Sequence, residues 1–177
     1  MIRRIDVTEL DRYGDSIRKI YEEALKFSPA ASEYLLTRIR KSAENSLHPI
    51  VLLSFYGDRP VGFVFGFDFA PQNWWAQQID SRLPRDFDWY DSTFELNELA
   101  VLPSHQKQNR GLHLMRELLD QMPHRHALLA TKKEDNDHVI RFYRALGFDV
   151  VIDDFRYAGD VYDLSLILGW KRGELKK

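Results

Sequence analysis

The sequence contains no cysteine among its 177 residues, which excludes a disulfide framework, a cysteine-bearing metal site and a cysteine nucleophile. It has no apolar run near the roughly 18 residues that a membrane-spanning helix needs. Its formal net charge is -2, so the chain has no overall excess of positive charge of the kind that binds nucleic acid. The N-terminal stretch carries arginines but no apolar signal-peptide core. We therefore expect a cytoplasmic protein with no membrane or nucleic-acid partner.

The length and composition suit one globular domain with a sizeable core, spanning residues 1–177. No internal repeat or linker divides the chain. Mostly apolar runs predict strands at residues 2–7, 50–56, 60–69, 94–102, 127–131, 148–152 and 162–168. Helical spacing predicts helices from the N-cap Thr8 to about Phe27, from the cap Ser32 to about residue 43, and at residues 112–122 and 137–146. Asp11 would complete a capping box with Thr8, and the tail at 171–177 is charged and expected to fray.

The chain is organised around residues 94–115, a predicted strand followed by a polar loop and a helix. Gly111 falls at or near the first turn of this helix. The first N–H groups of a helix lack intrahelical partners and carry the positive end of its dipole, so a loop of this kind can cradle an anion. Lys107 and Arg110 would add positive charge. The alternative is an ordinary strand-to-helix turn, because one glycine is a weak signal.

Two segments of the sequence resemble a known family. Gln108-Asn109-Arg110-Gly111-Leu112-His113 resembles the pyrophosphate loop of the GCN5-related N-acetyltransferases (GNAT), and residues 136–148 are similar to that family's Asn-x-x-Ala-x-x-x-Tyr-x-x-x-Gly-Phe segment. His113 stands where glycine or alanine is usual, and the loop after Pro103 is about two residues longer than the common form. The resemblance implies an α/β fold with a mixed, mostly antiparallel twisted sheet of six to seven strands and about four helices.

The resemblance also implies acetyl-CoA as co-substrate, an amine as acceptor, and a set of contact residues. The strand backbone would hold the pantetheine arm, the loop and first turn of the helix would hold the pyrophosphate, and an asparagine and a tyrosine would lie near the thioester. The cofactor-binding residues expected in this way are Leu99, Ala100, Val101, Gln108, Asn109, Arg110, Gly111, Leu112, His113, Leu114, Asn136 and Tyr143.

Three residues are candidates for the proton transfers. Tyr143 is the expected acid, since a phenol with an ordinary pKa of about 10 is protonated at pH 7; the alternative is a core aromatic on a helix stripe. Glu95 and Glu98 compete as the base, Glu95 being preferred slightly. They differ in strand parity, so they should face opposite sides unless a bulge intervenes. The alternative is that one of them pairs with an arginine such as Arg141 or Arg144.

Residues 70–93 form an aromatic and acidic insertion. It could be a lid over an amine acceptor, since aromatic rings and carboxylates suit a cation, or a satellite hydrophobic cluster or dimer contact. Gly62 and Gly66 suggest relief of crowding among phenylalanines more than ligand contact. His124 and His126 have no supporting carboxylates at helical spacing, so no metal is expected; His113 is expected to face solvent or touch phosphate.

The leading hypothesis is an N-acetyltransferase that moves an acetyl group from acetyl-CoA to a primary amine of a small molecule, by direct attack in a ternary complex. A protein or peptide acceptor is an alternative, as is a non-catalytic acyl-CoA-binding regulatory module. A dinucleotide-binding domain is disfavoured because Gly-x-Gly-x-x-Gly is absent and residues 50–69 predict an antiparallel hairpin. The chain would be a monomer or a homodimer.

Overall fold

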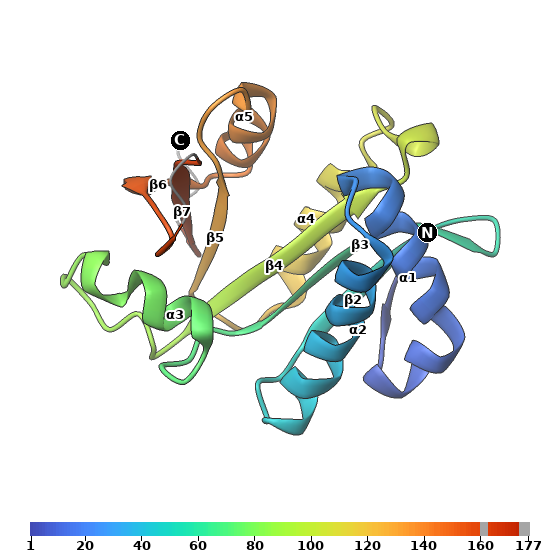
Figure 1. Cartoon of the computed structure of the whole chain (residues 1–177), viewed down its shortest axis with the longest axis horizontal. Coiled ribbons are helices and arrows are strands. Elements are labelled where there is room, and N and C mark those ends of the chain that lie inside the picture. The colour runs from blue at the N-terminus through green and yellow to red at the C-terminus, as the bar shows by residue number, and fades with distance from the viewer. Residues whose placement is uncertain (160–162, 174–177) are drawn as a thin grey trace. The chain divides into compact units, whose positions relative to one another are not determined.

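The computed structural model describes residues 1–159 and 163–173 (Figure 1). The chain forms two compact units. The first unit comprises Met1–Phe67 and Asn97–Pro123, and the second comprises Asp68–Leu96 and the residues from His124 onward. The strand β4, Thr93–Val101, contributes its first part to the second unit and its last part to the first. The prediction of a single domain stays a prediction.

Seven strands form one sheet in the order β1-β2-β3-β4-β5-β7-β6. The pairs β1–β2, β2–β3, β5–β7 and β6–β7 are antiparallel, whereas β4 and β5 are parallel. This confirms the predicted mixed, mostly antiparallel sheet; the described residues hold five α-helices rather than about four. None of these helices is both long enough and apolar enough to cross a membrane.

The first unit begins with β1 (Ile2–Ile5) and two long helices, α1 (Leu10–Leu25) and α2 (Pro29–Glu44), which lie side by side in Figure 1. The predicted hairpin is present as β2 (Ile50–Tyr56) and β3 (Arg59–Asp68). Gly57 makes its turn with φ +58°, a conformation that glycine adopts without a steric penalty. The α1 helix buries Ile17 and Ile20, and α2 buries Leu35 and Ile39, as their helical spacing predicts.

Both predicted N-caps in this unit are wrong. The side chain of Asp6 accepts a hydrogen bond from the Thr8 N–H at 2.9 Å, and Glu9 completes the capping box, because a short 3-10 turn at Val7–Glu9 precedes α1. Ser28 caps α2 instead of Ser32, since Pro29 occupies the first helical position, where its missing N–H costs nothing. The buried Ser32 hydroxyl donates to Glu22 and to the Pro29 carbonyl.

Gly62 shows why a central strand of this unit contains glycine. A Cβ at Gly62 would lie 3.1 Å from the Ala100 carbonyl oxygen and 3.1 Å from Val101 Cγ2. The missing side chain therefore lets β3 pack closely against the end of β4 and against α4 (Arg110–Gln121). The close neighbours are these elements of the protein and not the phenylalanines that were expected to crowd the strand.

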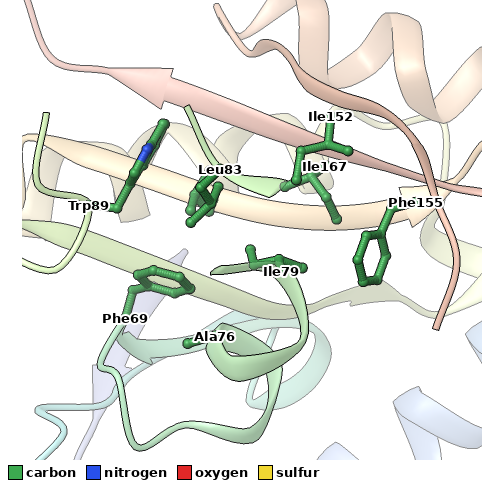
Figure 2. Close-up of a cluster of buried hydrophobic side chains, with 9 residues drawn as sticks. Phe69, Ala76, Ile79, Leu83, Trp89, Ile152, Phe155 and Ile167 are labelled. Carbon is green, nitrogen blue, oxygen red and sulfur yellow. The ribbon is translucent and has the colours of Figure 1, made fainter. Parts of the chain in front are cut away.

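The second unit contains the insertion and the C-terminal strands. Residues 70–93 include α3 (Trp74–Ile79) and a 3-10 turn, Asp80–Arg82. Figure 2 shows Ala76 and Ile79 of α3 in the same buried cluster as Ile152 and Ile167 of the sheet. The full buried cluster consists of Phe69, Ala76, Ile79, Leu83, Trp89, Leu128, Ile152, Phe155 and Ile167. The insertion thus supplies part of a hydrophobic core, as one of the two hypotheses predicted.

The remaining elements of this unit follow the sequence with shifted ends. They are β5 (His126–Lys132), α5 (Asp137–Ala145), β6 (Asp149–Phe155) and β7 (Ser165–Lys171). Gly147, at φ +93°, follows the last turn of α5 as predicted. The predicted strand 162–168 starts outside the described residues, as do residues 174–177 of the predicted tail.

Candidate active site

The loop between β4 and α4 (Arg110–Gln121) carries the predicted anion cradle. Lys107 and Asn109 adopt left-handed conformations, with φ of 57° and 58°, and Asn109 occupies the N-cap position without capping the helix through its side chain. No other side chain of the described residues is recorded as capping it, so the N–H groups of the first turn, which includes Gly111, remain available to a ligand. Residues 106–109 are exposed. The unit therefore presents an open helix N-terminus with positive potential.

Arg110 has a structural task at this cradle. Its Nη1 donates to Ser54 Oγ and to the Phe55 carbonyl, both at 3.2 Å, and its guanidinium lies 5.7 Å from the centre of the Tyr56 ring. These contacts fasten the first turn of α4 to the end of β2. Gln106 donates from Nε2 to the Val101 carbonyl at 2.9 Å, which ties the loop to β4. Because Arg110 is anchored in this way, Lys107 is the more accessible cation of the loop.

Glu98 lies on β4 within the first unit and has partners from both long helices. Arg38 of α2 donates to Glu98 Oε1 at 2.7 Å and to Asn97 Oδ1 at 2.9 Å, and the Tyr21 hydroxyl of α1 lies 3.3 Å from the same carboxylate oxygen. The side chain of Glu98 is 17% exposed. The predicted arginine partner exists, but it is Arg38 and not Arg141 or Arg144.

Burial raises the pKa of Glu98 above its ordinary value, although Arg38 and Tyr21 oppose the shift. The same environment raises the pKa of Tyr21 to about 12, through burial first and the neighbouring carboxylate second. Tyr21 is therefore a hydrogen-bond donor at neutral pH, and Glu98 is a carboxylate that takes up a proton more readily than an exposed one. A raised pKa is what a carboxylate needs to act as a general base near pH 7.

The two partners of Glu98, Tyr21 and Arg38, each contact an exposed aromatic ring. Phe27, 49% exposed, stacks on Tyr21 with ring centres 5.0 Å apart. The guanidinium of Arg38 lies 5.7 Å from the ring centre of Tyr34, which is also exposed. The first unit thus presents exposed rings, one in the α1–α2 connection and one on α2, on the residues that bind a partly buried carboxylate, a combination suited to an amine with an apolar part.

Glu95 lies on β4 within the second unit and is buried, with 5% exposure. Asn73 donates to Glu95 Oε2 at 3.0 Å and to the Asp68 carbonyl at 2.8 Å, which holds the carboxylate against the start of the insertion. The charge of Glu95 contributes to a raised pKa of Tyr157, whose main cause is burial. Glu95 and Glu98 therefore have separate partners, as their different strand parity indicated.

Asn136 stands at the N-cap position of α5 in the second unit. Its Nδ2 donates to Thr131 Oγ1 at 2.9 Å and to the Lys132 carbonyl at 2.8 Å. Both amide hydrogens are thus used inside the protein, so a contact with a cofactor would use Oδ1 as an acceptor.

The strand β5 pairs over different lengths with its two neighbours. Its parallel ladder with β4 has three residue pairs and reaches Leu128, whereas its antiparallel ladder with β7 continues to Lys132.

Tyr143 packs in the aromatic interior of the second unit. Its ring is 8% exposed and meets Phe142 and Phe148 edge to face, with ring centres 5.1 Å and 5.6 Å apart. This packing fixes the ring in a defined orientation. It is compatible with both hypotheses, a positioned acid and a core aromatic, so the role of Tyr143 stays a prediction.

Comparisons with known proteins decide the family. The sequence profile described as "Acetyltransferase (GNAT) family" matches residues 15–148, well over half of the chain. This chain belongs to the GNAT family. A GCN5-like protein acetyltransferase of Mycobacterium tuberculosis is 36% identical over 110 residues, which cover 56% of this chain and 53% of that relative. The match therefore spans about half the length of the curated relative.

Solved structures agree with the GNAT fold. A GNAT-family protein from Desulfovibrio desulfuricans superposes with a TM-score of 0.73 at 16% identity, covering 97% of this chain and 98% of that one. PaiA N-acetyltransferase from Thermoplasma acidophilum, solved in complex with coenzyme A, gives a TM-score of 0.61 at 20% identity, with coverages of 97% and 98%. At these identities the likeness shows the fold alone.

Sequence analysis missed three residues of this GNAT chain that hold the two glutamates. Tyr21 lies among the apolar residues of the first predicted helix, and Arg38 and Asn73 belong to no recognisable motif. Arg38 is 60 residues from Glu98 in sequence, so no local pattern links them. Within the described residues, no group of three or more histidines and carboxylates is placed to hold a metal ion. His124 instead bonds Asp68 Oδ1 at 2.8 Å.

Proposed function

We propose that this chain is an acetyl-CoA-dependent N-acetyltransferase acting on a primary amine. The observation that carries the proposal is the uncapped start of α4, which follows the exposed loop 106–109, where Lys107 and Asn109 adopt left-handed conformations. Such a helix start binds phosphate groups through its N–H groups and dipole. Membership of the GNAT family supports the same assignment.

The cofactor would contact the chain in two regions. The pyrophosphate would bind at residues 108–114, and the pantetheine arm would follow the backbone of Leu99–Val101. The Val101 carbonyl already accepts a hydrogen bond from Gln106. The pantetheine arm would therefore bond to the N–H group of Val101. Asn136 would contribute Oδ1. The PaiA structure with coenzyme A supports a coenzyme A ligand for this fold.

The chemistry needs a neutral amine, a proton acceptor and a stabilised leaving group. The amine nitrogen attacks the thioester carbonyl, its proton passes to a base, and the tetrahedral intermediate expels the thiolate of CoA, which a nearby acid protonates. Tyr143 is the proposed acid. Glu98 is the better supported base, because its pKa is raised and its partners Tyr21 and Arg38 contact exposed aromatic rings. Glu95 remains the second candidate; its carboxylate is buried and held by Asn73.

A small-molecule amine is the proposed acceptor class. The exposed rings of Phe27 and Tyr34 beside Arg38 and Glu98 would receive the apolar part of such an amine. A lysine side chain of a protein is a second candidate, favoured by the relative named a protein acetyltransferase, which is 36% identical. A non-catalytic acyl-CoA-binding module is the remaining alternative.

An acceptor screen tests the proposal. Thiol release from acetyl-CoA should be measured with a panel of small primary amines and, separately, with lysine-containing peptides. Release with small amines supports the proposal, and release with peptides alone moves the acceptor to protein. If acetyl-CoA binds but no acceptor gives release above its spontaneous hydrolysis, the chain is a binding module. If acetyl-CoA neither binds nor raises the melting temperature, the acetyltransferase assignment fails.

A further inference from the structure

The second unit contains a hollow that neither glutamate touches. Its volume is about 420 Å³, within the size range of sites for small molecules. The end of α5, the start of β6 and the end of β7 surround it, and Phe87, Trp89 and His126 close it. Asn136, the predicted cofactor contact of this unit, lies at the other end of α5.

Flat rings make up much of the wall. Phe87 stacks on His126 with ring centres 4.4 Å apart and planes 19° from parallel, and Trp89 lies 5.9 Å from the same imidazole. Trp170 of β7 lines the hollow as well. Rings arranged in this way offer faces and edges to a flat ligand, whose stacking adds to the gain from burying apolar area.

Polar groups at the hollow favour an anion. Arg144 lines it at the last turn of α5, and no ion pair of Arg144 occurs within residues 1–159 and 163–173. Lys171 and Asp149 also line it, and both have partners elsewhere in the structure. A guanidinium presents paired N–H donors that match the two oxygens of a carboxylate. An anion would supply the partner that Arg144 lacks among these residues.

His126 adds an unsatisfied polar atom. Its Nδ1 is buried and has no hydrogen-bond partner within the described residues. Burial lowers the pKa of His126, and the charges of Arg125 and Lys171 lower it further, so the ring is neutral at pH 7 and does not compete with Arg144 for an anion. Buried polar atoms without a partner are uncommon in native structures, and bound water, an ion or local strain can account for one.

We infer that this hollow is a binding site for a small aromatic carboxylate, with the carboxylate on Arg144 and the ring among Trp89, His126 and Trp170. The site is separate from the proposed acetyl-transfer chemistry and does not depend on it. Its ligand would contact the end of α5, the helix that carries Tyr143, and would act as an effector rather than as an acceptor.

Calorimetric titration with indole-3-carboxylate tests the inference. Binding should be saturable, and the uncharged amide of the same ring and acetate should both bind at least about tenfold more weakly, because one lacks the charge and the other the ring. Arg144→Gln should weaken binding about tenfold or more. Arg141→Gln, a change at an exposed arginine of the same helix outside the lining, should leave binding unchanged.

The tryptophan indole N–H signals in a two-dimensional NMR spectrum give the location. The chain has four tryptophans; those of Trp89 and Trp170 should shift on titration, and those of Trp74 and Trp75 should not. Four results would each overturn the inference: no saturable binding, equal affinity in Arg144→Gln, preference for benzylamine, or displacement of the probe by coenzyme A. The first three results leave the acetyl-transfer proposal untouched, whereas displacement by coenzyme A would place the cofactor in the hollow, so the failures of the two proposals can be told apart.

Discussion

Removing the guanidinium that faces Glu98 should destabilise the first unit in a pH-dependent way. Arg38→Met keeps most of the aliphatic stem and removes the donors to Glu98 and Asn97. Hydrogen bonds to charged groups contribute about 1.5–3 kcal/mol. The side chains of Arg38 and Glu98 are 27% and 17% exposed, so water can replace part of the hydrogen bonding that the substitution removes. We expect unfolding at pH 7 to become easier by about 1–3 kcal/mol.

The sign of the pH dependence follows from the raised pKa of Glu98. Glu98 binds its proton more tightly in the folded state than in the unfolded chain. Its contribution to the free energy of unfolding is therefore fully present below the unfolded pKa of about 4.3. It is lost as the pH rises through the folded pKa. Arg38→Met removes the charge that opposes the shift, so its stability should fall more steeply with pH than that of the wild type.

Urea denaturation at pH 5, 7 and 8.5 measures both effects. Arg40→Met is the matched control: Arg40 lies on the same helix, and its nearest carboxylate, on the exposed Asp11, is 3.9 Å away, so the change should cost less than about 0.5 kcal/mol. Adding Glu98→Gln to Arg38→Met should abolish the extra pH slope. Two results would refute the proposed interaction between Arg38 and Glu98. One is an equal loss of unfolding free energy in Arg38→Met and Arg40→Met, and the other is an extra pH dependence of stability that persists in the double variant.

Three other changes test separate parts of the account. Gly62→Ala should destabilise by about 1–3 kcal/mol in urea, because its Cβ meets backbone at 3.1 Å; a neutral result would show that β3 and β4 can separate at no cost. Gly111→Val should weaken coenzyme A binding in calorimetry far more than it lowers the melting temperature, whereas normal binding by the folded fraction would make Gly111 structural. Tyr143→Phe keeps the ring packing and should lower turnover about 10²–10⁴-fold with little change in acetyl-CoA affinity; near-normal turnover would remove Tyr143 as the acid.

Sequence periodicity predicted most of the fold, because the apolar faces of the helices and strands are buried as their spacing requires. The paired motifs located the loop and the uncapped start of α4, since Gly111 and the flanking polar residues are contiguous in the chain; that this loop binds pyrophosphate stays a prediction. Cap assignment failed twice for a local reason. Asp6 and Thr8 are both good N-cap residues, as are Ser28 and Ser32, and the choice depends on a 3-10 turn and on Pro29.

The partners of the two glutamates could not be predicted in the same way. Glu98 meets Tyr21 and Arg38 only after two helices have packed onto the sheet, across sequence separations of 77 and 60 residues. Asn73 reaches Glu95 from an insertion without periodic pattern. A charged residue in a central strand indicated that a partner or a function must exist, and the identity of that partner required the tertiary structure.

Amide hydrogen exchange with and without acetyl-CoA tests the central claim most directly. Binding should slow exchange at the first turn of α4, Arg110–Leu112, where no side chain caps the helix. It should also slow exchange at the end of β4, Leu99–Val101, which lies beyond the ladder that pairs Thr93–Glu95 with β5. The same experiment on Gly111→Val should show weaker protection at equal ligand concentration. Saturable acetyl-CoA binding that leaves both segments unprotected would contradict the account, since the cofactor would then bind elsewhere.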